Sequence, residues 1–134
     1  MIKLEKTDAA GLKKRILVVE DEPYLRDLYL EILKEEGFKV DSASDGEEAY
    51  AKMKAGGYDL VLLDIMLPKM DGLEVLRKLK ENKLQNLNKA VLLLTNLGQE
   101  TIISEGVSLG VRGYLIKSDY TPDNLVKEIK EALK

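Results

Sequence analysis

The sequence predicts an α/β three-layer sandwich built around a five-stranded parallel sheet. Five short segments rich in apolar residues alternate along the chain with five stretches that have helical spacing. Three of these segments contain only apolar residues, as expected for strands that are buried on both faces. Regular alternation of such strands with helices favours parallel strands that are covered by helices on both sides of the sheet.

The predicted strands differ in how apolar they are, and this difference predicts their order. The strands are expected at residues 16–19, 38–43, 60–63, 91–94 and 113–116. The first, third and fourth are wholly apolar and should be central, whereas the second alternates apolar and polar residues like an edge strand with one wet face. The expected order is therefore 2-1-3-4-5, which is flavodoxin-like and has its ligand site beyond the carboxyl ends of the strands.

Start and stop signals delimit the predicted helices. Asp21 or Glu22 can cap a first helix that has Pro23 in its first turn and ends at Gly37. A second helix covers 45–55, a third follows the loop that holds Pro68 and Gly72, a fourth covers 100–109, and Thr121-Pro122 opens the last. The side chains expected on the inner helix faces are Leu25, Leu28, Tyr29, Ile32, Leu33, Leu73, Leu76, Leu79, Ile102, Ile103, Val107, Leu125, Ile129 and Leu133.

Composition excludes several classes of function. A chain of 134 residues fits one domain, which we place at 15–134, after a loose N-terminal extension at 1–14. The absence of Cys and His excludes thiol and imidazole nucleophiles, disulfides and the common zinc sites, so a bound metal would need oxygen ligands. The net charge of -3 argues against direct nucleic-acid binding. No apolar run approaches the roughly 20 residues that span a bilayer, so we expect a cytoplasmic protein without membrane insertion.

Four predicted strands end next to residues that can react or bind ions. Glu20-Asp21-Glu22 follows the first strand, Asp64 the third, Thr95 the fourth and Lys117 the fifth. Each could separately be a helix cap or a surface charge, but the carboxyl ends of parallel strands meet at one edge of a sheet. The sequence therefore predicts that these residues form one site.

Such a site suits phosphoryl transfer. Clustered acids repel one another unless a cation lies among them, and Mg²⁺ (or Mn²⁺) prefers carboxylate oxygens. An ionised Asp64 can attack phosphorus, while Lys117 and the Thr95 hydroxyl can neutralise charge on the phosphoryl oxygens.

Four sequence motifs carry a family resemblance: ILVVEDEP at 16–23, LVLLDIMLPKMDG at 60–72, LLLT at 92–95 and GYLIK at 113–117. In order and spacing the chain resembles the receiver domain of bacterial two-component response regulators (CheY-like) over nearly its whole length. The resemblance implies a signalling domain, not a classical enzyme, that assists its own phosphotransfer and dephosphorylation. Its expected partners are a sensor histidine kinase or phosphotransfer protein and an unidentified downstream protein.

The resemblance also implies roles for individual residues. Asp64 would be the phospho-acceptor, and Mg²⁺ would be bound by Asp21 directly, by Glu20 through water, by Asp64 and by the backbone carbonyl of Met66. Thr95 and Tyr114 would form a switch pair that changes the surface of the fourth helix, fifth strand and fifth helix. Lys117 would be the cation of the site.

Two departures from the family pattern have consequences. Ser118 stands where the family usually has a proline joined by a cis bond. A cis bond without proline costs on the order of 3 kcal/mol, so we expect a trans bond and a differently placed loop here. Met66 and Leu97 stand where polar side chains often position water, so we expect slow self-dephosphorylation.

Other classes of protein fit the sequence less well. A phosphatase of the haloacid-dehalogenase type needs a second acid two residues after the first, but Met66 occupies that position. A flavin site would need Ser, Thr and Gly to bind phosphate where this chain has the acids at 20–22. An interaction module that has lost phosphorylation stays open, although the acids and the lysine are all kept. Because the last predicted helix runs to Lys134, we expect a stand-alone receiver rather than one cut from a larger regulator.

Overall fold

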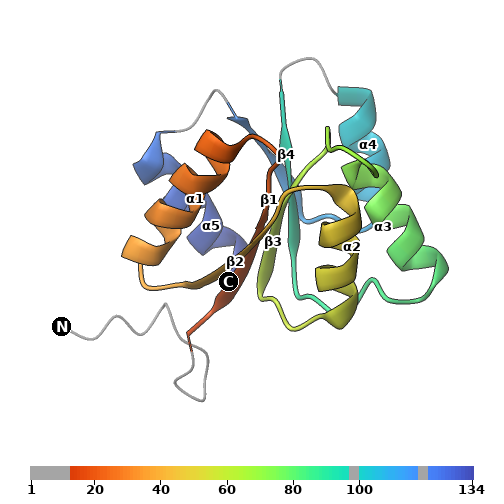
Figure 1. Cartoon of the computed structure of the whole chain (residues 1–134), viewed down its shortest axis with the longest axis horizontal. Coiled ribbons are helices and arrows are strands. Elements are labelled where there is room, and N and C mark those ends of the chain that lie inside the picture. The colour runs from red at the N-terminus through yellow and green to blue at the C-terminus, as the bar shows by residue number, and fades with distance from the viewer. Residues whose placement is uncertain (1–12, 97–99, 118–120) are drawn as a thin grey trace.

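Five parallel strands form one sheet in the order β2-β1-β3-β4-β5, as the sequence predicts. The computed structural model describes residues 13–96, 100–117 and 121–134 (Figure 1). The strands are β1 (Arg15–Val19), β2 (Lys39–Ala43), β3 (Leu60–Asp64), β4 (Val91–Thr95) and β5 (Gly113–Ile116). Each strand pairs in parallel with its neighbour, and β2 and β5 form the edges.

The helices complete a three-layer sandwich. They are α1 (Pro23–Glu35), α2 (Gly46–Ala55), α3 (Gly72–Glu81), α4 (Glu100–Ser108) and α5 (Pro122–Ala132). One face of the sheet carries α1 and α5, and the other carries α2, α3 and α4 (Figure 1). None of the described helices combines the length and apolar character needed to cross a membrane. Of the predicted N-terminal extension, 1–12 lies outside the described residues.

Two apolar cores lie on the two faces of the sheet. Alternate residues of a strand point to opposite faces, so Leu17 and Leu63 pack toward α2 and α3, whereas Val18 and Leu62 pack toward α1 and α5. Both faces of the central strands are therefore buried, which explains their uninterrupted apolar sequences.

Side-chain caps begin four of the helices. Glu22 Oε2 accepts from the Leu25 N–H at 2.7 Å, which decides between the two predicted caps of α1. Asp45, Asp71 and Thr121 cap α2, α3 and α5 in the same way. The predicted stop at Gly37 is confirmed, because this glycine follows α1 with a positive φ of 90°.

Two apolar residues predicted to face inward are instead exposed. Leu28 is 36% exposed, because α1 turns Tyr29 and Leu33 into the core and leaves Leu28 at the margin of that face. Val107 is 58% exposed, because α4 lies against the sheet through Gly106, where an added Cβ would be 2.4 Å from Leu93 Cδ1. Successive residues of a helix are turned by about 100°, and Val107 lies on the side of α4 away from this contact.

Gly72 is the first residue of α3 and packs against the end of β3. The prediction that it lies in the loop before this helix is wrong. Its N–H donates to the Ile65 carbonyl at 2.8 Å, and an added Cβ would lie 2.4 Å from the Asp64 carbonyl oxygen. That contact is with backbone, which cannot move aside without shifting Asp64.

Replacing this glycine should therefore destabilise the protein. We expect Gly72→Ala to lower the free energy of unfolding by about 2 kcal/mol, as overpacking typically does, measured by urea denaturation. Gly113→Ala is the matched control, because its Cβ would meet Leu92 Cδ2 at an ordinary 3.5 Å. Equal stability of the two variants would contradict the close approach at Gly72.

Candidate functional site

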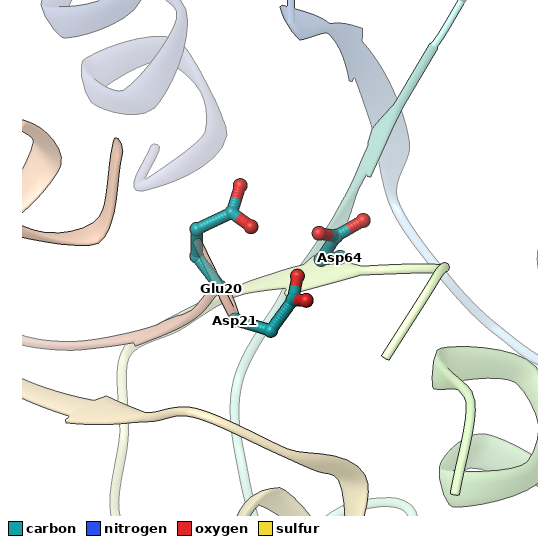
Figure 2. Close-up of side chains that lie close together, drawn as sticks. All are labelled: Glu20, Asp21 and Asp64. Atoms are coloured by element: carbon teal, nitrogen blue, oxygen red, sulfur yellow. The ribbon is translucent and has the colours of Figure 1, made fainter. Parts of the chain in front are cut away.

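The predicted site residues do converge at the carboxyl edge of the sheet. Glu20 follows β1, Asp64 ends β3, Thr95 ends β4 and Lys117 follows β5. The register of β1 against β3 pairs Val19 with Leu63, so the residues that come next are neighbours. Figure 2 shows the carboxylates of Glu20, Asp21 and Asp64 gathered in one region.

Lys117 joins two of the acids directly. Its Nζ donates to Glu20 Oε1 at 2.7 Å and to Asp64 Oδ2 at 2.7 Å. The Glu20 side chain is 1% exposed, that of Asp64 is 4% exposed and that of Lys117 is 13% exposed. Charges buried to this extent need partners, and each of these three groups has one.

The three carboxylates could hold a divalent cation. One oxygen each of Glu20, Asp21 and Asp64 lies within 4.8 Å of the others, the one such group among the described residues. Asp21 is exposed, so the cluster opens toward solvent on its side. Carboxylate oxygens are the ligands that Mg²⁺ and Mn²⁺ prefer, and three acids against one ammonium leave negative charge that a cation would balance. The donor set therefore fits the predicted ion.

Burial and neighbouring charges shift the pKa values of two site residues, Glu20 and Lys117. Burial raises the pKa of Glu20, and the nearby Asp64 carboxylate raises it further against the opposing effect of Lys117. For Lys117, burial disfavours the charged form, but its hydrogen bonds to Asp64 and Glu20 outweigh burial and raise its pKa. Lys117 therefore stays an ammonium group at neutral pH.

Backbone and side-chain donors fix the orientation of the two buried acids. The Met66 N–H donates to Asp64 Oδ1 at 3.2 Å, and the Glu22 N–H donates to Glu20 Oε2 at 3.2 Å. The Arg26 guanidinium donates to the Glu20 carbonyl oxygen at 3.1 Å.

Sequence reasoning missed Arg26, because nothing in its helical position indicates a bond back to the end of the preceding strand. The metal-ligating role of the Met66 carbonyl stays a prediction.

Thr95 and Tyr114, the predicted switch pair, occupy contrasting environments. Thr95 is 1% exposed and its hydroxyl donates to the Asn96 carbonyl at 3.2 Å. Tyr114 lies on the edge strand β5 and is 46% exposed. Their joint role stays a prediction. Two further positions discussed from the sequence, Leu97 and Ser118, lie outside the described residues.

Comparison with known proteins identifies a family and several relatives. The family model described as the response regulator receiver domain matches residues 16–130. The transcriptional regulatory protein SrrA of Staphylococcus aureus is 37% identical over 123 residues, which are 92% of this chain and 49% of that protein. The chain thus spans about half the length of the curated relatives it matches.

Solved structures agree with this match. A CheY-like receiver domain protein from Methanospirillum hungatei has a TM-score of 0.79 and 31% identity, over 90% of this chain and 93% of that one. The chemotaxis response regulator CheY4 of Vibrio cholerae has a TM-score of 0.78 and 27% identity, over 89% and 98%. With its sheet order, its acidic cluster and its paired lysine, this chain belongs to the response regulator receiver domains of two-component systems.

Proposed function

We propose that the chain is a phospho-accepting receiver in which Asp64 takes a phosphoryl group from a sensor histidine kinase or phosphotransfer protein. The observation that carries this proposal is the ammonium group of Lys117, 2.7 Å from both Asp64 and Glu20 at the acidic cluster. A surface ion pair would need one acid, whereas here two buried acids share one lysine and a third acid lies beside them, an excess of negative charge that a divalent cation would neutralise. Mg²⁺, or Mn²⁺, would be bound by Glu20, Asp21, Asp64 and the Met66 carbonyl.

The residues of the site have complementary parts in the transfer. An oxygen of the ionised Asp64 attacks phosphorus; the new O–P bond forms as the P–N bond of the donor's phosphohistidine breaks, and its electron pair returns to the imidazole. Lys117 neutralises charge on the phosphoryl oxygens, and the Thr95 hydroxyl, at the adjacent strand end, donates to one of them. A divalent cation, when bound, neutralises further oxygen charge. In this role the chain is a signalling domain that assists its own phosphotransfer and dephosphorylation.

The proposed output surface comprises α4, β5 and α5. Thr95 ends the strand beside β5, and Tyr114 lies on β5 itself, so a rearrangement of this pair would reach that surface directly. Apolar side chains are already exposed there, with Val107 at 58% and Tyr114 at 46%. Phosphorylation would shift the balance between two states of this surface, which docks a downstream protein.

Two contexts remain for this receiver, which we place in the cytoplasm. A stand-alone protein is supported by the match to CheY4, of which 98% is covered. A receiver within a longer regulator is supported by SrrA, a transcriptional regulatory protein of which 49% is covered. In the second context nucleic-acid binding would fall to another domain, because the net charge of this chain is -3.

Labelling with acetyl phosphate tests the proposal. With Mg²⁺, the wild-type chain should gain one phosphoryl group by intact mass, and Asp64→Asn or removal of the metal with EDTA should abolish it. Asp27→Asn, on the exposed surface of α1, is the matched control and should be labelled normally. An unlabelled wild-type chain would favour the interaction module that has lost phosphorylation.

The acidic cluster should also make stability depend on metal. In Asp64→Asn one carboxylate charge is removed while an amide oxygen can still accept from Lys117, leaving one buried acid for one ammonium. Without Mg²⁺ we expect the Tm to rise by about 3 °C, equivalent to roughly 1 kcal/mol. Mg²⁺ should raise the wild-type Tm by mass action and that of Asp64→Asn less. A lower Tm for Asp64→Asn in EDTA would contradict this account.

The phosphorylated chain should lose its phosphoryl group slowly. The Met66 side chain is 60% exposed beside Asp64, where it can hinder an attacking water. Met66→Asn should shorten the lifetime of the acyl phosphate severalfold, measured by loss of the labelled mass. Leu87→Asn, an exposed apolar residue on the loop before β4, should leave the lifetime unchanged. A wild-type lifetime of only seconds would refute the expectation.

A further inference from the structure

Tyr29 is an unusual member of the core between the sheet and helices α1 and α5. It is 7% exposed, and the other described residues of this core are Ala, Val, Leu, Ile and Phe. A buried tyrosine normally directs its hydroxyl to a hydrogen-bond partner, because an unpaired polar group in an apolar core is costly. The sequence pattern assigned Tyr29 to the apolar face and gave no indication of where its hydroxyl points.

The charges of the phosphorylation site act on this phenol. Burial raises the pKa of Tyr29, the carboxylates of Glu20 and Asp64 raise it further, and the ammonium of Lys117 opposes them. The hydroxyl is therefore within electrostatic reach of all three buried charges of the site.

A small cavity links Tyr29 with Lys117. It has a volume of about 40 Å³, and its polar lining residues are Tyr29, Lys117 and Thr121 among apolar side chains of α1, β4, β5 and α5. Every fully buried polar side-chain atom of the described residues has a hydrogen-bond partner. No hydrogen bond joins the Tyr29 hydroxyl to another described residue, and the Tyr29 side chain lines this cavity.

Lys117 can donate one more hydrogen bond than Glu20 and Asp64 accept from it. An ammonium group has three protons, and two of them are directed to Glu20 and Asp64. A water molecule needs a cavity of roughly 10–15 Å³ and two or more polar partners, and this cavity provides both. The Thr121 hydroxyl accepts from the Asn124 N–H at 3.3 Å, and its own O–H can donate to such a water.

We propose that Tyr29 is a positioning residue, whose hydroxyl holds the Lys117 ammonium group through a water bound in this cavity. With its third proton engaged on the α1 side, the ammonium group keeps the other two directed at Glu20 and Asp64. The consequence for phosphoryl transfer rests on the proposed function, but the placement of the ammonium group does not.

Tyr29→Phe tests this role, because it removes the hydroxyl and keeps the ring. In the unphosphorylated ¹⁵N-lysine protein we expect the Lys117 ammonium protons to exchange with water at least about five-fold faster, the loss that one hydrogen bond represents. The rate of labelling by acetyl phosphate should fall by a similar factor of roughly five.

Tyr58→Phe is the matched control. Tyr58 is 5% exposed, but its hydroxyl donates to Asp41 Oδ2 at 2.7 Å, on the wet face of β2. This variant should lose stability and keep wild-type proton exchange at Lys117 and wild-type labelling.

The outcomes separate the two proposals. Wild-type exchange and labelling in Tyr29→Phe, with an equal or higher Tm, would overturn the positioning role and leave Tyr29 as a packing residue. If the wild-type chain itself is not labelled, the proposed function fails, while the exchange measurement still decides the role of Tyr29.

Discussion

The burial of two carboxylates beside a single ammonium group is the constraint on which the rest of the structure depends. Glu20 and Asp64 lie at the ends of the adjacent strands β1 and β3, whereas Lys117 follows β5, which is separated from β3 by β4. Its side chain must therefore pass the end of β4 to reach them. The residue at that end is Thr95, which is 1% exposed. On the proposed function, the hydroxyl at this strand end would also be a donor to the phosphoryl group.

Holding like charges together also requires rigid loops around them. The loop after Asp64 is fixed on one side by Gly72, which begins α3, and on the other by Gly46, which begins α2. The Gly46 N–H donates to the Pro68 carbonyl at 3.1 Å, and an added Cβ would lie 1.6 Å from the Met70 carbonyl oxygen. Two glycines at helix starts therefore hold the loop that follows Asp64. These contacts, with the hydrogen bond from the Met66 N–H, restrict the position of Asp64.

Much of this could be predicted from the sequence, because it follows from local patterns. Apolar runs identify the strands and their central or edge positions, and parallel topology brings the strand ends to one edge, which places Glu20, Asp64, Thr95 and Lys117 together. Periodicity does not say how wide a helix face is covered, so Leu28 and Val107 were misplaced. Contacts such as that of Arg26 with the Glu20 carbonyl depend on side-chain direction, which spacing does not encode.

The same geometry suggests how phosphorylation would reach the output surface. A phosphoryl group carries about -1.5 to -2 charge and offers Lys117 stronger acceptors than a carboxylate does. The Thr95 hydroxyl now donates to the carbonyl of Asn96, the residue that leads out of β4 toward α4. On the proposed function, turning that hydroxyl to a phosphoryl oxygen breaks this bond, so the backbone after β4 loses a restraint as the site gains one. The hydrogen bond donated by the Thr95 hydroxyl would then couple the covalent change at Asp64 to the conformational change at α4.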